Sequence, residues 1–238
     1  MTLHILATGT NRGIGEAIAS ALAGPGLRLI GHASRPTEDN ATIPADLDEP
    51  GAAAALWEEA LRRLDGRIDV LVNNAGIFEA SPIDLPGDEW CRQWERTMRV
   101  NLTASAELCR LAVLHWQQRG SGGRIVNVAS RAAYRGDSPA HWHYAASKAG
   151  MVALTKTIAR GYARDGIYAF AVCPGFTMTG MAEEYLASRG GDRLLADIPL
   201  GKVATPDEVA TAVRFLAIEA PPSMTGAVID INGASYVR

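Results

Sequence analysis

Residues 3–15 read LHILATGTNRGIG, an apolar run followed at once by three closely spaced glycines, Gly9, Gly13 and Gly15. The run from Leu3 to Ala7 predicts a short buried strand, and apolar residues at helical spacing from Ile14 to Ala23 predict a helix directly after it. A glycine-rich turn at this place lets a phosphate approach bare backbone at the positive end of the helix dipole. The pattern therefore indicates an anion-binding turn, with a turn that serves only chain reversal as the alternative.

The same alternation of short apolar runs and helical patterns continues to the end of the chain. Further strands are predicted at 27–30, around Ile43, and at 68–72, 125–128, 168–172 and 228–231. Further helices are predicted at 51–64, from Asp88 as N-cap through Ala104 to Gln118, at 144–164 and at 207–218. Because no hairpin signals separate the strands, we expect an α/β fold, doubly wound, with a mostly parallel sheet covered by helices on both faces.

Composition restricts the class of protein. The 238 residues are 47% hydrophobic, which suits one large core and predicts a single domain over 1–238. The 23 basic and 26 acidic residues form no basic stripe, which argues against a nucleic-acid partner. The three cysteines lack paired spacing, which argues against a disulfide framework or a zinc site. No apolar run approaches membrane length, so we expect a soluble cytoplasmic protein without a membrane partner.

One stretch breaks the regular alternation. Residues 176–199 follow Pro174 and Gly175 and are rich in glycine and charge. A long loop inside a compact domain commonly serves a function, so we predict a substrate lid over about 176–199.

Tyr144 and Lys148 are four residues apart in a predicted helix, so their side chains lie on one face and can share a site. Reduction of a ketone needs a proton at the carbonyl oxygen, and a phenol with a pKa of about 10 is a poor acid-base group at neutral pH. A neighbouring ammonium favours tyrosinate and lowers the pKa of the phenol. The pair is predicted to transfer protons, although such pairs also occur as ordinary surface contacts of helices.

Five motifs, in order, resemble those of the short-chain dehydrogenase/reductase family. They are TGTNRGIG at 8–15, NNAG at 73–76, Asn101, Ser130 with YAASK at 144–148, and Pro174-Gly175. The resemblance covers nearly the whole chain, and 3-oxoacyl-carrier-protein reductases are the best-known relatives. It implies a seven-stranded Rossmann sheet and a hydride transfer between a nicotinamide cofactor and a carbonyl or secondary alcohol carbon.

The resemblance also implies a catalytic set of Asn101, Ser130, Tyr144 and Lys148. Ser130 is implied to bind the substrate oxygen, and Asn101 to hold a water that links Lys148 to solvent. From Ser130 to Tyr144 the chain is one residue longer than is usual in the family, and the loop between them is expected to absorb the difference.

By the same resemblance, Asn74, Ala75 and Gly76 line the cofactor, Asp46 faces the adenine, and Thr177 and Thr179 bracket the nicotinamide. Asp46 could instead be a helix cap. The predicted cofactor-binding residues are Gly9, Asn11, Arg12, Gly13, Ile14, Gly15, Ser34, Arg35, Asp46, Leu47, Asn74, Ala75, Gly76, Tyr144, Lys148, Pro174, Gly175, Thr177 and Thr179.

The segment after the second predicted strand bears on the choice of cofactor. NAD-selective Rossmann sites usually place an acidic residue there, which binds the ribose 2′-hydroxyl and repels a 2′-phosphate. Here the chain reads GHASR at 31–35, with no acid before Glu38. Ser34 and Arg35 can bond a phosphate, and Arg12 offers a second cation. NADP(H) is therefore favoured over NAD(H), with a solvated Arg35 as the alternative.

Two charged or metal-binding patterns lie in the loop before Tyr144. His141 and His143 form a His-x-His pair, but without a third ligand nearby no metal site is predicted. Arg131 and Arg135 could attract a carboxylate or a carrier-borne acyl group, or could simply be solvated.

Three functions remain open at this point. An NADPH-dependent carbonyl reductase is favoured, and the alternatives are an NAD(H)-dependent dehydrogenase of a sugar, steroid or other secondary alcohol, and a non-catalytic dinucleotide-sensing module. The family resemblance also implies a homo-oligomer, most often a tetramer. Apolar residues on more than one side of the predicted helix from Leu102 to Trp116 agree with this expectation.

Overall fold

The computed structural model describes residues 2–178 and 191–238, without the side chains of 192–194. The described chain forms one seven-stranded, all-parallel sheet of order β3-β2-β1-β4-β5-β6-β7, so the predicted α/β class and parallel topology are confirmed. Its strands are β1 (Leu3–Ala7), β2 (Leu27–Ala33), β3 (Thr42–Pro44), β4 (Val70–Asn73), β5 (Gly123–Val128), β6 (Ile167–Pro174) and β7 (Val228–Ile231).

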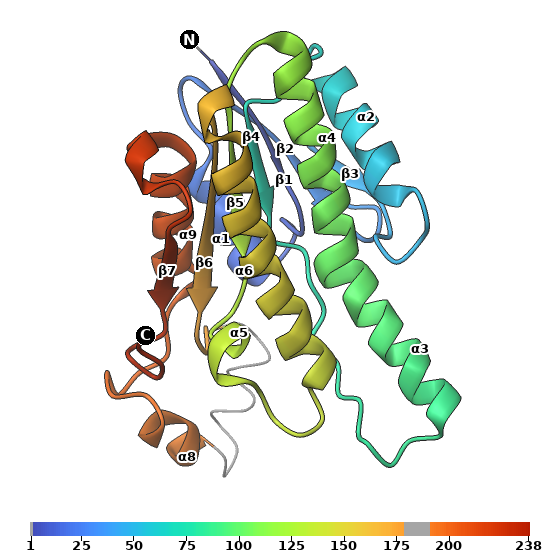
Figure 1. Cartoon of the computed structure of the whole chain (residues 1–238), viewed down its shortest axis with the longest axis vertical. Coiled ribbons are helices and arrows are strands. Elements are labelled where there is room, and N and C mark those ends of the chain that lie inside the picture. Colours follow the sequence, from blue (N-terminus) through green and yellow to red (C-terminus); the bar gives the residue numbers. More distant parts are fainter. Residues whose placement is uncertain (1, 179–190) are drawn as a thin grey trace.

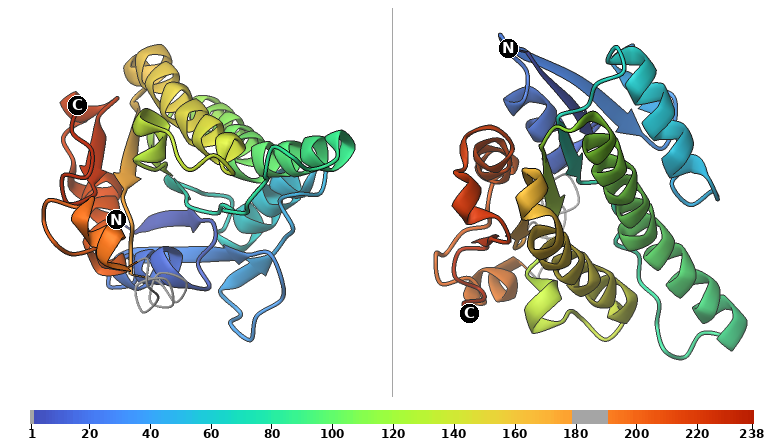
Figure 2. Two further views of the ribbon diagram at one scale, coloured as in Figure 1. Left: turned by 90° about the horizontal axis from the view of Figure 1, so that it is seen from below. Right: turned by 45° about the horizontal axis from the view of Figure 1, so that its top comes forward.

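Helices cover both faces of this sheet (Figures 1 and 2). One face carries α2 (Ala52–Arg63), α4 (Ala104–Arg119) and α6 (Trp142–Tyr162), and the other carries α1 (Gly13–Ala21) and α9 (Pro206–Arg214). Each face has its own apolar core, around Trp116 and Leu56 on the first face and around Ile18 and Phe170 on the second. Two-sided burial explains why the central strands read as continuous apolar runs rather than as alternating patterns.

The order of strands reverses next to β1, which pairs with β2 on one side and with β4 on the other. In open parallel sheets of this kind, the crevice outside the carboxyl ends of the strands at the reversal point binds ligands. The predicted glycine turn follows β1, so the fold places it at this crevice.

The region predicted as one helix from Asp88 to Gln118 is three consecutive segments. They are α3 (Gly87–Met98), the π-helical segment η1 (Arg99–Thr103) and α4. The prediction of Asp88 as N-cap is wrong, because α3 begins at Gly87 after Pro86, and Asp88 lies in the first turn, where its carboxylate accepts a hydrogen bond of 2.8 Å from Arg92. Proline suits a helix start because its missing amide is not needed there.

The predicted loop at 176–199 is only partly a loop. Residues 191–196 form the short helix α8 (Gly191–Ala196), so a structureless loop is wrong there, while 179–190 and with them Thr179 lie outside the described residues. Beyond α8 the chain lies against the residues that follow β7, where the amide of Leu200 donates to the carbonyl of Gly233 (3.1 Å). The lid remains a prediction.

Most apolar residues of α4 face the core rather than a partner. Leu108 and Val113 are buried and Leu114 is 48% exposed, while Leu102, in η1 just before α4, packs toward α6 against Gly150. Fewer apolar residues of this helix are therefore available to contact a partner subunit than the sequence suggested. Within the described ranges, no helix has the length and apolar character that a membrane span requires.

Candidate active site

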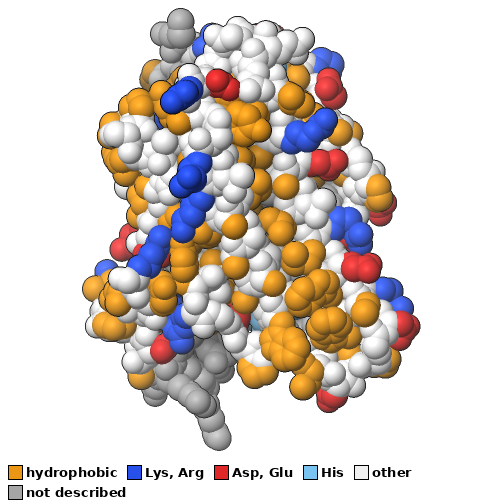
Figure 3. Space-filling model, in the orientation of Figure 1, with side chains coloured by type: hydrophobic (Ala, Val, Ile, Leu, Met, Phe, Trp, Pro, Cys, Tyr) orange, Lys and Arg blue, Asp and Glu red, His pale blue; other side chains and the backbone are white. Residues whose placement is uncertain are grey.

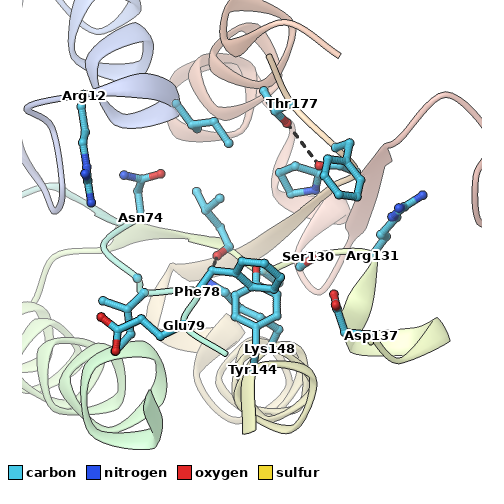
Figure 4. A pocket seen from close by; sticks show the side chains of 18 residues that line it. Arg12, Asn74, Phe78, Glu79, Ser130, Arg131, Asp137, Tyr144, Lys148 and Thr177 are labelled. Carbon is cyan, nitrogen blue, oxygen red and sulfur yellow. Dashed lines mark hydrogen bonds between the residues drawn. The ribbon is translucent and has the colours of Figure 1, made fainter. Parts of the chain in front are cut away.

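A cavity of about 450 Å³ lies at the carboxyl ends of the central strands (Figure 4). Figure 4 shows Arg12 and Asn74 toward one end of it and Arg131 and Asp137 toward the other, with Ser130, Tyr144 and Lys148 between them. Its lining is Arg12, Ile14, Asn74, Gly76, Ile77, Phe78, Glu79, Val128, Ala129, Ser130, Arg131, Asp137, Tyr144, Lys148, Pro174, Gly175, Phe176 and Thr177.

The glycine turn needs its glycines for steric reasons. Gly9 and Gly13 have φ of 69° and 54°, which favours residues without a Cβ. A Cβ on Gly15 would lie 1.7 Å from the carbonyl oxygen of Gly9, so any side chain there would displace backbone. Among residues 2–178 and 191–238, no side chain caps the start of α1, whose N-cap residue is Arg12. The first amides of α1 are therefore not bonded by these side chains, which fits binding of the phosphates of a dinucleotide.

Thr8 and Asn74 hold this turn against the end of β4. The amide nitrogen Nδ2 of Asn74 donates to the carbonyls of Thr8 (3.0 Å) and Gly9 (2.9 Å). In return, Oγ1 of Thr8 accepts hydrogen bonds of 3.0 Å from the backbone amides of Asn74 and Ala75. The predicted cofactor residues Asn74 and Ala75 are thus bonded to the turn, and Asn74 also lines the cavity.

His32 is a third support of the turn, and sequence reasoning missed it. Its Nδ1 accepts a hydrogen bond from the amide of Gly9 (3.1 Å), and its Nε2 donates to the carbonyl of Ala45 (2.8 Å). Burial lowers the pKa of His32, against the opposing effects of the Ala45 bond and the charge of Asp46. His32 is therefore neutral near pH 7. The only sequence signal for this role was the occurrence of a histidine just after a predicted apolar strand.

The structure brings the predicted catalytic residues together. Tyr144 and Lys148 lie on α6, and Nζ of Lys148 is 5.8 Å from the centre of the Tyr144 ring. Nζ of Lys148 also donates a hydrogen bond of 2.9 Å to the carbonyl of Val128, at the end of β5. Ser130 lies just beyond this point, and its Oγ accepts from the amide of Ala132 (3.1 Å). One cavity wall thus holds a hydroxyl, a phenol and an amine.

The site shifts the pKa values of the phenol and the amine in opposite directions. The expected lowering of the phenol pKa by the ammonium is not seen in this structure: burial raises the pKa of Tyr144 to about 12, although the hydrogen bond with Ser130 acts in the opposite direction. Burial lowers the pKa of Lys148 to about 8. Tyr144 therefore keeps its proton at neutral pH and is ready to donate it, while Lys148 is still mostly charged.

Asn101 occupies the π-helical segment, a kind of irregularity that is frequent at functional sites. Its Oδ1 accepts from the amide of Ile77 (2.8 Å), and its Nδ2 donates to the carbonyl of Ile77 (3.0 Å) and to Oγ of Ser147 (3.3 Å). A Cβ on Gly76 would lie 3.3 Å from Oδ1 of Asn101 and 3.5 Å from Nζ of Lys148. Asn101 therefore fixes the cavity wall beside Lys148.

Several predicted cofactor residues do not line the cavity. Ser34, Arg35 and Asp46 are exposed, and Leu47 is buried in the core. Oδ1 of Asp46 accepts a hydrogen bond from the amide of Asp48 (3.0 Å), which stabilises a local turn. Arg12, Pro174, Gly175 and Thr177 line the cavity as expected.

Phe78 is a second residue that sequence reasoning missed. Its ring stacks on His141, with centroids 3.9 Å apart, and meets the ring of Tyr144 edge-on at 4.8 Å. The imidazole of His141 thus supports an aromatic wall next to the phenol. In the described part of the chain, no three His, Cys, Asp or Glu side chains are grouped as metal ligands.

Comparisons with known proteins agree with this geometry. A family model described as enoyl-(acyl carrier protein) reductase matches residues 9–234. A 3-oxoacyl-[acyl-carrier-protein] reductase of Vibrio cholerae is 36% identical, across 98% of this chain and 96% of the relative. An acetoacetyl-CoA reductase of Shinella zoogloeoides is 34% identical, across 99% of each.

Among solved structures, an NADP-bound protein of Agrobacterium tumefaciens, provisionally assigned as a 2-deoxy-d-gluconate 3-dehydrogenase, superposes with a TM-score of 0.86. It is 28% identical, and the match covers 98% of this chain and 96% of that one. The chain belongs to the short-chain dehydrogenase/reductase family and is an oxidoreductase that acts on carbonyl or alcohol groups.

Proposed function

We propose that the protein is an NADPH-dependent reductase of a ketone, of the 3-oxoacyl-reductase type. The observation that carries the proposal is the single cavity that joins the glycine turn to Ser130, Tyr144 and Lys148. When bound, the dinucleotide supplies a hydride to the carbonyl carbon. The reductase names of the relatives support a carbonyl substrate, and a protonated Tyr144 supports the reductive direction.

The chain's own residues supply the other parts of the reaction. Ser130 donates a hydrogen bond to the carbonyl oxygen and holds it beside the phenol. Tyr144 gives that oxygen its proton as the hydride arrives, so the ketone becomes a secondary alcohol and the phenol becomes tyrosinate. The ammonium of Lys148 stabilises the tyrosinate. Asn101 fixes the cavity wall beside Lys148, where a water molecule can return a proton to Lys148.

The cofactor is held by the crevice around the reversal point of the sheet. The free amides of residues 13–15 bind its pyrophosphate, Asn74 and Gly76 line its middle, and Thr177 with Pro174 and Gly175 contacts the nicotinamide end. Arg12 and Arg35 bind the 2′-phosphate of NADPH. Arg12 lines the cavity, both side chains are exposed, and no acidic side chain stands between Gly31 and Arg35 to repel a phosphate.

The direct test compares NADPH with NADH in the reduction of acetoacetyl-CoA and a panel of simple ketones. We expect kcat/KM to be at least tenfold higher with NADPH, and the Arg12→Ala, Arg35→Ala double variant to lose most of that preference. A wild type that favours NADH, or oxidises secondary alcohols with NAD⁺ far better than it reduces ketones, would support the alternative dehydrogenase. A double variant with full NADPH selectivity would show that these arginines do not bind the phosphate.

The protein is also proposed to be cytoplasmic and a homo-oligomer, most simply a tetramer. Hydrophobic side chains gather where the lower parts of α3 and α6 face the viewer in Figure 3. In this region Trp90 stacks on Trp94 and meets Trp142, which is 54% exposed. Trp90 and Trp94 are half-buried, and partly exposed apolar clusters of this kind commonly mark contact surfaces. Light scattering at micromolar concentration tests this, and a monomer would refute it.

A further inference from the structure

A second, smaller hollow adjoins the active-site cavity on its substrate side. It measures about 290 Å³ and is lined by Arg131, Arg135, Gly136, Asp137, Ser138 and Phe176. Arg131, Asp137 and Phe176 line both cavities, so the hollow is an annex of the reaction site. Figure 4 shows Arg131 directly beside Ser130. A substrate whose carbonyl oxygen is bound by Ser130 can therefore extend another of its groups into the annex.

Arg131 is a largely buried cation whose guanidinium lies 5.3 Å from the centre of the Phe176 ring and whose hydrogen-bonding capacity is not filled by the described residues. Its side chain is 12% exposed, and its Nη1 is buried without a hydrogen-bond partner among the described residues. The nearest carboxylate oxygen, Oδ2 of Asp197, is 3.5 Å from Nη1. Burial and the nearby charge of Arg135 lower the pKa of Arg131, while the charges of Asp197 and Asp137 act in the opposite direction. A desolvated guanidinium in this state strongly favours a properly placed anion.

The carboxylate of Asp197 is a replaceable partner for this cation. Its side chain is 48% exposed, and its Oδ2 accepts a hydrogen bond of 2.6 Å from Nη1 of Arg135. Asp137 also lines the annex, where its carboxylate accepts a hydrogen bond from the amide of Ser138 (2.7 Å) and lies 4.0 Å from Nδ1 of His141. Because the contact of Asp197 with Arg131 is long and Asp197 itself is half-exposed, a substrate carboxylate that approaches Arg131 more closely can take its place.

We propose that Arg131 is a specificity-determining residue that binds a carboxylate of the substrate, so that the substrate class is a small oxo acid. The inference rests on the NADPH-dependent ketone reduction proposed above, and it narrows the ketone to one that carries a free carboxylate in place of a 3-oxoacyl thioester. A carboxylate is chosen because one already lies beside both arginines, in Asp197, and because a guanidinium bonds a carboxylate with two parallel hydrogen bonds. In Figure 4 the guanidinium of Arg131 points away from Tyr144, so the substrate carboxylate and the ketone would lie at different places in the site.

The test uses 3-oxobutanoate, 4-oxopentanoate and 5-oxohexanoate, each beside its methyl ester, with NADPH. We expect the wild type to prefer at least one acid over its ester by tenfold or more in kcat/KM. In Arg131→Gln the ratio of acid to ester should fall at least tenfold, mainly through KM for the acid. Asp197→Asn should lower KM for the acid severalfold, because it removes the competing carboxylate.

Arg92→Gln is the matched control, since Arg92 is an exposed arginine on α3, ion-paired to Asp88 and outside both cavities. It should leave the ratio unchanged. Equal efficiency with acids and esters in the wild type would overturn the inference while the reductase function stands. Failure to reduce any ketone would instead refute the reductase function and the inference with it. If Arg131→Gln does not fold, an Asp197→Asn variant with an unchanged KM for the acid still overturns the inference.

Discussion

The two ends of the active-site cavity are built in different ways. At the cofactor end, His32 and Asn74 bond the backbone of the turn after β1, and Thr8 in that turn accepts from the backbone amide of Asn74. At the substrate end, Arg131 and Arg135 are matched mainly by Asp197, a half-exposed side chain from a distant segment. The cofactor end is held by hydrogen bonds to backbone atoms, whereas the substrate end is held by ion pairs whose partners can be exchanged.

This difference indicates which end of the cavity has a fixed shape and which end can exchange its ion-pair partners for a substrate group. Backbone hydrogen bonds in a crevice of fixed shape give a cofactor site that exists before the ligand arrives. Exchangeable ion pairs allow a substrate group to replace an internal one. Variants at the cofactor end should therefore alter cofactor affinity and folding, those at the substrate end should alter selectivity, and those between the two ends should alter the chemical step.

The largest effect is expected at Tyr144, which lies between the two ends. Tyr144→Phe removes the transferable proton and keeps the ring, so kcat should fall by about 10³-fold, while the Kd for NADPH stays within about twofold of wild type. Steady-state assays measure kcat, and fluorescence titration measures the Kd for NADPH. Tyr162→Phe, on the same helix but outside the cavity, should keep near-normal turnover. Substantial turnover in Tyr144→Phe would refute the mechanism.

A smaller effect, of about 10²-fold, is expected from Lys148→Met, in both kcat and kcat/KM for NADPH. Because the pKa of Lys148 is lowered to about 8, the ammonium is present below that pH and is lost above it. The kcat/KM for NADPH of the wild type, which reports groups of the free enzyme, should therefore fall as the pH rises past about 8. Lys148→Met should abolish that fall, and Lys156→Met on the same helix should retain it. A flat wild-type profile between pH 7 and 9.5 would contradict this role.

The smallest effects are expected from replacing two glycines, one at the cofactor end and one outside the site. Gly15→Ala places a Cβ 1.7 Å from the oxygen of Gly9, so it should cost about 2 kcal/mol of unfolding free energy and weaken NADPH binding about tenfold. Gly161 lies near the end of α6 with open space around it, so Gly161→Ala should stabilise the fold by up to about 1 kcal/mol and leave NADPH binding unchanged. Denaturant unfolding and NADPH titration measure both variants, and equal behaviour would remove the steric argument for Gly15.

The fold was predictable to a large extent because its signals are local. Each central strand is a short apolar run, each helix has its own periodicity, and the absence of hairpin signals left parallel pairing as the natural topology. The errors occurred where local signals compete. Asp88 is a favourable N-cap, but Pro86 starts the helix earlier, and the glycine-rich stretch at 176–199 concealed the short helix α8.

The sequence by itself determined the glycine turn after the first strand and the placement of Tyr144 and Lys148 on one helical face, because both depend on residues that are neighbours in the chain. Only the tertiary structure decided that His32 supports that turn, that Phe78 stacks beside Tyr144, and that Asp197 meets Arg131 and Arg135. These contacts join segments far apart in the chain, and their burial and distance follow from how the helices and strands pack. No local pattern encodes them.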